Sequence, residues 1–256
     1  MSTTTATTTR TSGAPPPPVT MIGVAQLRAT NDKVYNLLEI AKCVAWAKQK
    51  QTRMLFLPEN CGFMGEAPGE TLQQAEPPVG EENANTETVT HLIQKVYDET
   101  LQGTVEPTSF SEATTLDSPP EVVSLLDGIR TLARRAQMWI SVGGLHVRGA
   151  PPHPETNQPR FYNTHLILDD TGAVQAIYRK IHLFDVCIPG KVNLMESNST
   201  AAGQDVVLCD TPVGKKMRQE LQCGWKYDFD DRSKADSIPS NVFYFRFRTT
   251  GTFDLL

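Results

Sequence analysis

The sequence contains few cysteines, and they form no pattern typical of a disulfide framework or a structural zinc site. The five cysteines among its 256 residues are odd in number and widely spread, and no two are spaced as Cys-x-x-Cys. Such a set suits reduced thiols better than paired ones. The five histidines are equally scattered, so a zinc site would have to be assembled wholly by the fold. We therefore expect no metal ion.

Long apolar runs and clusters of basic residues are also missing. No window approaches the roughly 18 consecutive apolar residues that a membrane helix needs, and the first twenty positions lack the apolar core of a secretory signal. The formal net charge is -5, with no basic run that could neutralise several phosphates. We expect a soluble, cytoplasmic protein that binds neither membranes nor nucleic acids. A mitochondrial location is the alternative, because residues 1–18 contain hydroxyls and no acids, although Arg10 is their only basic residue.

Composition divides the chain into a core region and poorly ordered parts. A chain of this length with 39% hydrophobic residues can bury one large core. Residues 1–18 are rich in threonine and end in four prolines, which predicts a disordered tail. A loose insertion is expected at about 103–120, where Ser, Thr, Pro and acids predominate. Residues 216–256 form a divergent tail of uncertain structure.

The pattern of apolar residues predicts an alternating α/β fold. A strand over 21–27, a helix from the capping pair Asn31-Asp32 to about Lys50, and a strand over 53–57 form a β-α-β unit. Both strands are nearly continuous in apolar residues, as expected for strands covered on both faces. Similar signals predict helices near 88–101 and over 121–137, a strand over 139–147, and hairpins over 161–179 and 206–215. The run 216–221 alternates with no consistent face and cannot be a central strand.

Two charged residues stand directly after apolar strands. Glu59 follows Leu55-Phe56-Leu57 and Pro58, and Lys180 follows the second strand of the 161–179 hairpin. Open α/β sheets place their working residues just past the strand ends, and a lysine there is unfavourable unless it faces negative partners in a cleft. The plainer alternatives are an edge lysine that reaches to water and a turn carboxylate bonded to backbone amides.

Three motifs together resemble one family. The segments LFLPEN (55–60), YRKIHLFDV (178–186) and PGKVNLMESNST (189–200) resemble the carbon-nitrogen hydrolase (nitrilase) superfamily. The ESNST run is most similar to the deaminated glutathione amidase branch and less so to omega-amidase. The resemblance covers about residues 21–215. It implies a carbon-nitrogen hydrolase domain over 19–215 with a nitrilase-type α-β-β-α sandwich that is incomplete at its C-terminal end.

The resemblance also implies an activity and roles for three residues. The family activity is hydrolysis of a non-peptide carbon-nitrogen (amide) bond of a small linear substrate, here deaminated glutathione, without a cofactor. Glu59 would be the general base, Lys180 would stabilise the tetrahedral intermediate and help to protonate the departing ammonia, and Glu196 would position the lysine or the substrate. For Glu196 the plainer alternative is a solvated loop acid. Family members self-associate, which implies a homo-oligomer.

The expected nucleophile is missing from its place. Counting from the Gly214-Lys215 turn, the family cysteine should stand at about Leu221. Cys223 lies two residues on, on the same face of an extended strand, but no apolar strand supports it. The alternative is therefore a catalytically dead, truncated or mis-spliced family member that at most pairs with another copy. A second alternative is an omega-amidase-like activity.

Overall fold

The structure is a computed structural model of the chain that describes residues 20–66, 69–81, 87–103, 123–188, 192–219, 242–247 and 253–255. The disordered tail expected at 1–18 lies outside the described residues. So does the insertion expected at 103–120, apart from residue 103, and so does most of the tail expected at 216–256.

The chain opens with the β-α-β unit that the sequence predicts. Strand β1 (Thr20–Ala25) leads to helix α1 (Lys33–Gln49), which is followed by strand β2 (Met54–Phe56). Asp32 caps the helix, because its side-chain oxygen accepts a hydrogen bond of 3.0 Å from the backbone N–H of Tyr35. The two strands are parallel neighbours, so both carboxyl ends lie at the same edge of the sheet.

The other predicted helices and the central strands also occur in the predicted order, and the short helix at Glu70–Gln73 was not predicted. The helix predicted over 121–137 begins at Leu125, because the Ser124 side chain caps it by accepting a hydrogen bond from the Asp127 N–H. The elements are α2 (Glu70–Gln73), α3 (Glu87–Leu101), α4 (Leu125–Ala136), β3 (Trp139–Val147), β4 (Tyr162–Leu168) and β5 (Val174–Arg179).

A seven-stranded sheet in the order β11-β10-β1-β2-β3-β4-β5 forms the centre of the fold. Two of its strands, β10 (Val242–Phe247) and β11 (Phe253–Leu255), come from the tail that the sequence left without a structure. Strand β10 runs antiparallel to β1. The divergent end of the chain therefore extends the sheet at the β1 edge.

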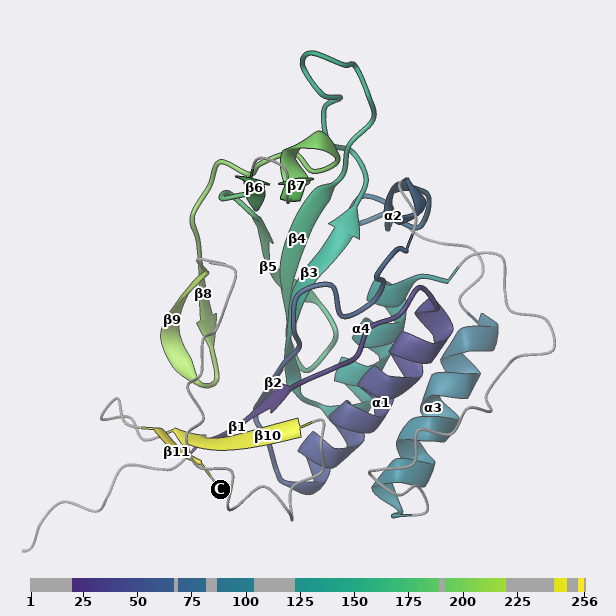
Figure 1. Cartoon of the computed structure of the whole chain (residues 1–256). Helices are drawn as coiled ribbons and strands as arrows, with labels where there is room; N and C mark the ends of the chain where they lie inside the picture. Colours follow the sequence, from purple (N-terminus) through teal and green to yellow (C-terminus); the bar gives the residue numbers. More distant parts are fainter. Residues whose placement is uncertain are drawn as a thin grey trace, which may run out of the picture.

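Helices α1, α3 and α4 cover one face of this sheet (Figure 1). Helix α1 is buried almost along its whole length between the sheet and the other two helices. Gly128 lets α4 approach it closely, since a side-chain Cβ there would lie 2.5 Å from Leu37 Cδ2. None of the helices in the described part of the chain is long and apolar enough to cross a membrane.

On the opposite face, the described residues cover part of the sheet. A small cluster of Met54, Ile167 and Ala176 packs there against the hairpin of β8 (Val207–Thr211) and β9 (Gly214–Gln219). Coverage of both faces was expected for β1 and β2. Met54 and Leu55 of β2 point to opposite faces and are both fully buried, whereas Ile22 and Val24 of β1 are partly exposed. A second sheet with its own helices, which would complete an α-β-β-α sandwich, is not among the described elements.

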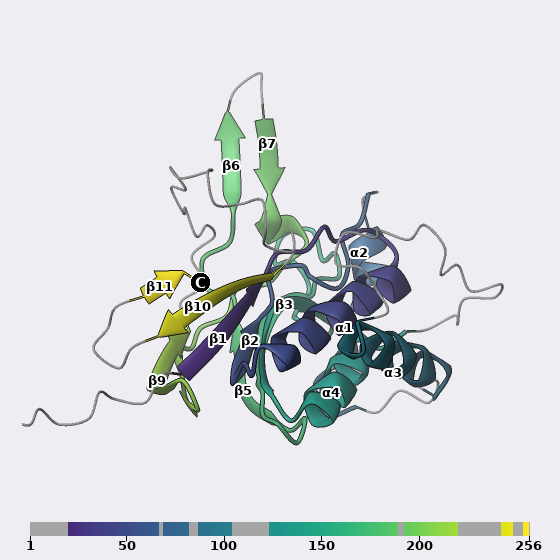
Figure 2. The same cartoon turned by 90° about the horizontal axis from the view of Figure 1, so that it is seen from below.

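Two hairpins extend from the main sheet. Strands β6 (Asp185–Ile188) and β7 (Val192–Met195) pair only with each other and project from the body of the molecule (Figure 2). Strand β9 pairs with β8 in a separate two-stranded sheet. The prediction that the run after Lys215 is not a central strand is therefore confirmed for the part up to Gln219.

Candidate functional site

Lys180 leaves the end of β5 and points into a cavity beside two carboxylates. Its Nζ lies 2.9 Å from Glu59 Oε1 and 3.0 Å from Glu196 Oε2. The lysine is only 2% exposed, so it does not reach to bulk water as an edge lysine would. The structure thus brings together all three residues that the sequence singled out, although 121 residues separate Glu59 from Lys180.

Glu59 is held in place by a tight turn against the middle of β3. Asn60 adopts a left-handed conformation with φ 56°, and its N–H donates to the Gly144 carbonyl at 3.1 Å. The strand is irregular here, with a register shift between Val142 and Leu145. Glycine is required at 143, because a Cβ would lie 2.5 Å from the Leu57 carbonyl oxygen. The Gly143-Gly144 pair thus allows the backbone of the Glu59 turn to approach β3 closely.

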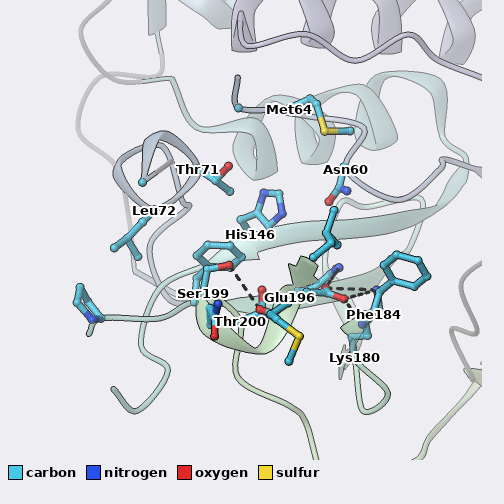
Figure 3. Close-up of a pocket in the computed structure, with 18 of the residues that line it drawn as sticks. Asn60, Met64, Thr71, Leu72, His146, Lys180, Phe184, Glu196, Ser199 and Thr200 are labelled. Carbon is cyan, nitrogen blue, oxygen red and sulfur yellow. Dashed lines mark hydrogen bonds and ion pairs between the residues drawn. The ribbon is translucent and has the colours of Figure 1, made fainter. Parts of the chain in front are cut away.

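Glu196 is oriented by the ESNST segment, which forms the 3₁₀ turn η1 (Glu196–Asn198). Its Oε2 accepts a hydrogen bond of 2.6 Å from the Phe184 backbone N–H in addition to the contact with Lys180 (Figure 3). Its carbonyl accepts from the Thr200 N–H at 2.9 Å, which closes the turn. A side chain that is 17% exposed and bonded in this way is not a solvated loop acid.

Sequence reasoning missed two further residues at the same place, Asn163 and His146. Asn163 Nδ2 lies 2.6 Å from Glu59 Oε1 and 3.5 Å from Glu196 Oε1. His146 lines the cavity with its ring 4.7 Å from that of Phe161, in an edge-on arrangement. For Asn163, the sequence offered one signal, the polar run 163–165 within the first strand of the hairpin over 161–179.

The groups at the site that can accept a proton at neutral pH include the two carboxylates, Glu59 and Glu196. One ammonium lies between two carboxylates, which compensates the desolvation of the lysine. Burial lowers the pKa of His146 to about 4, and the nearby Glu59 and Glu196 offset that effect only in part. Its imidazole is therefore neutral at neutral pH and offers a hydrogen bond rather than a charge.

The cavity in front of these residues has a volume of about 720 Å³, within the range of sites for small organic molecules. Figure 3 shows His146, Asn60 and Met64 on one side and Lys180, Glu196 and Ser199 on the other. Seven apolar side chains contribute to its lining: Met64, Leu72, Pro159, Phe161, Phe184, Leu194 and Met195. The described residues contain no group of three or more His, Cys, Asp or Glu that could hold a metal ion.

No thiol among the described residues lines this cavity. Cys43 and Cys61 are buried, and Cys61 directs its Sγ at the Gly143 carbonyl at 3.6 Å. Burial raises the pKa of Cys61 to about 12, which leaves almost no thiolate at neutral pH. Leu221 and Cys223, where the sequence places the expected nucleophile and its substitute, lie outside the described residues. The site as described thus contains the carboxylates and the cation, without the nucleophile.

The cysteines should differ sharply in reactivity toward iodoacetamide in the native state. Cys187 is exposed on β6, and we expect it to be alkylated within minutes at pH 8. Cys43 and Cys61 should remain unmodified until the protein unfolds, because both are buried and burial raises the pKa of each. Peptide mass spectrometry with and without urea measures this. Rapid native labelling of Cys61 would contradict the packing described here.

Comparison with known proteins gives a consistent result. A family model described as Carbon-nitrogen hydrolase matches residues 21–224. The match continues past Lys215, where the sequence resemblance was expected to end, and it includes Cys223. Human deaminated glutathione amidase is 31% identical over 196 residues, which are 76% of this chain and 46% of that protein. The chloroplastic omega-amidase of Arabidopsis thaliana is 28% identical over 196 residues, 76% of this chain and 40% of that protein.

A solved structure is similar as well. The crystal structure of the Caenorhabditis elegans NitFhit protein superposes with a TM-score of 0.51 and 28% sequence identity, covering 77% of this chain and 36% of that chain. In all three comparisons the chain spans less than half the length of the protein that it matches.

Proposed function

Because the chain belongs to the carbon-nitrogen hydrolase family, we propose that it hydrolyses the amide bond of a small linear substrate. One observation carries this proposal. The buried Lys180 ammonium lies 2.9 and 3.0 Å from two carboxylates at the wall of a cavity. A fixed cation in such a place is suited to stabilise the oxyanion that forms when an amide carbonyl is attacked.

In the proposed reaction, Glu59 takes the proton from a thiol and the thiolate attacks the amide carbon. Lys180 stabilises the negative charge on the carbonyl oxygen and helps to pass the proton from Glu59 to the leaving ammonia, which returns Glu59 to its ionised form, while Glu196 holds Lys180 in position. The resulting thioester is attacked by a water molecule from which Glu59 takes a proton. The thiolate leaves and takes that proton from Glu59, so the products are ammonia and a carboxylic acid, and the thiol is regenerated.

We propose Cys223 as the source of that thiol. Strand β9 runs back toward the site, because Gln219 at its end pairs with Val207. Upstream of Val207, the Gly203 N–H donates to the Lys180 carbonyl at 2.8 Å. Cys223 stands four positions after Gln219 in the sequence, and the family match includes it.

Deaminated glutathione is the substrate that we propose, since a relative at 31% identity is named for that activity. The cavity supports a molecule larger than a simple amide, because its lining combines apolar side chains with uncharged polar groups such as Thr71, Gln158 and Ser199. An omega-amidase-like activity is the second candidate, given the 28% identity with a protein of that name. Rates with deaminated glutathione and with a short aliphatic ω-amide distinguish the two.

Ammonia release by the purified chain tests the proposed reaction. Turnover by the wild type should fall about 100-fold or more in Cys223→Ala, because no other nucleophile stands in the mechanism. The matched control is Cys187→Ala, which removes an exposed thiol outside the cavity lining and should retain activity. If the Cys223→Ala variant were as active as the wild type, Cys223 would be excluded as the nucleophile.

A catalytically inactive chain that associates with another copy is the alternative function. One observation favours it: the cavity has no thiol among its described residues. A folded wild type without turnover on either substrate would support it. Sedimentation velocity then measures whether the chain self-associates.

A further inference from the structure

We infer that Asn163 is a positioning residue, whose side-chain amide holds the Glu59 carboxylate in its ionised form and in a fixed orientation. This inference rests on the proposed function, in which Glu59 acts as the general base. The residue lies on β4, next to His146 of β3 in the strand register. It is 2% exposed, so its contacts are made in the protein interior.

The first argument is the hydrogen-bonding geometry. Glu59 Oε1 accepts from Asn163 Nδ2 at 2.6 Å and from Lys180 Nζ at 2.9 Å. The same amide nitrogen lies 3.5 Å from Glu196 Oε1. An asparagine NH₂ group has two donors and no charge. Asn163 can therefore link the two carboxylates without adding a charge or a titrating group to the site.

The orientation of the amide follows from the chemistry of its neighbours. Both nearby carboxylates are acceptors when ionised, so the NH₂ group must face them; a carbonyl oxygen 2.6 Å from Glu59 Oε1 would be repelled. This leaves Asn163 Oδ1 buried and without a hydrogen-bond partner. A buried carbonyl oxygen in that state is unfavourable, and such groups in native structures are often associated with functional sites.

Packing fixes the side chain in this position. A Cβ at Gly144 would lie 2.3 Å from Asn163 Oδ1 and 3.0 Å from Glu59 Cγ. The amide therefore occupies space that exists only because residue 144 is glycine. On the backbone side, the Asn163 carbonyl accepts from the Lys180 N–H at 2.8 Å. Asn163 thus holds the Glu59 carboxylate through its side chain and the Lys180 backbone N–H through its main chain.

The consequence for Glu59 is electrostatic. The described groups that face it include the Lys180 ammonium, the Glu196 carboxylate, the Asn163 amide and the neutral His146 and His165 rings. Hydrogen bonds donated to a carboxylate favour its ionised form. Removal of the Asn163 donor takes one hydrogen bond away from the ionised carboxylate, so protonation of Glu59 should become easier.

The test uses two variants that remove the donor without adding charge, Asn163→Ser and Asn163→Ala. Serine is too short to reach Glu59, and alanine serves if the serine variant does not fold. The control is Asn193→Ser, on an exposed position of β7. The full chain is labelled with ¹³C-glutamate, and the chemical shift of the Glu59 carboxyl carbon is followed by NMR over pH 3 to 8. The signal is assigned because it disappears in the Glu59→Gln variant.

The titration midpoint of Glu59 should move up by about one pH unit in a folded Asn163 variant and stay in place in the control. If the wild type turns over an amide, kcat should fall about tenfold with little change in KM, and the acid limb of the pH profile should move with the midpoint. An unchanged midpoint in a folded variant overturns the inference. If the wild type does not turn over an amide, the proposed reaction is wrong. The titration midpoint of Glu59 then tests the role of Asn163 by itself.

Discussion

Replacement of Lys180 by methionine should lower the free energy of unfolding by about 3 kcal/mol, because it removes the ammonium that lies between two partly buried carboxylates. Lys180 is 2% exposed, and the Glu59 and Glu196 side chains are 27% and 17% exposed. Methionine fills most of the lysine volume, so the loss reflects charge rather than a cavity. The same variant should abolish amide hydrolysis if the proposed mechanism holds.

Urea unfolding followed by circular dichroism at pH 7 measures this loss. The matched control is Lys95→Met on α3, whose side chain is 61% exposed and lies 3.9 Å from Glu99; its effect should stay within about 0.5 kcal/mol. Glu196→Gln in the Lys180→Met background should restore part of the stability, since it removes one of the two unbalanced charges. A loss below about 1 kcal/mol for Lys180→Met would contradict this reason. It would show that water, or a proton bound by one of the carboxylates, compensates Glu59 and Glu196.

The stability of the protein should fall as the pH decreases from about 6.5 to about 4. Burial lowers the pKa of both His146 and His165 from the ordinary 6.5 to about 4. In that pH range the unfolded chain binds protons that the folded chain does not, so the free energy of unfolding rises with pH. The stabilisation is complete above pH 6.5 and is lost as the pH falls through the folded-state values.

His165 should contribute about half of this effect, because its pKa is lowered as far as that of His146. It is 8% exposed, and its Nε2 lies 2.7 Å from Ser141 Oγ, whereas His146 is partly exposed in the cavity. The slope from His165 is about 1 kcal/mol per pH unit near pH 5. Urea midpoints at pH 7, 6 and 5 measure it. His165→Gln should flatten the dependence, while His91→Gln, at an exposed position of α3, should leave it unchanged. Equal slopes in all three proteins would contradict the assignment.

The amino-acid sequence predicted the parts of the fold that depend on local pattern. Apolar runs and the Asp32 cap located β1, α1 and β2, because strand and helix periodicity depend on residues close together in the chain. Glu59 and Lys180 stood out since each follows an apolar strand. Glu196 was indicated only by family resemblance, because nothing in its local sequence distinguishes it from a loop acid.

The tertiary structure decided which side chains meet. Asn163 is an ordinary strand residue in the sequence, and only the bulge at Gly144 on the neighbouring strand places its amide against Glu59. The neutral state of His146 likewise follows from burial, and β10 joins β1 across more than 200 residues of chain. Local sequence determines the type and order of elements, whereas contacts, desolvation and pKa values depend on groups that are distant in sequence and become neighbours only when the sheet assembles.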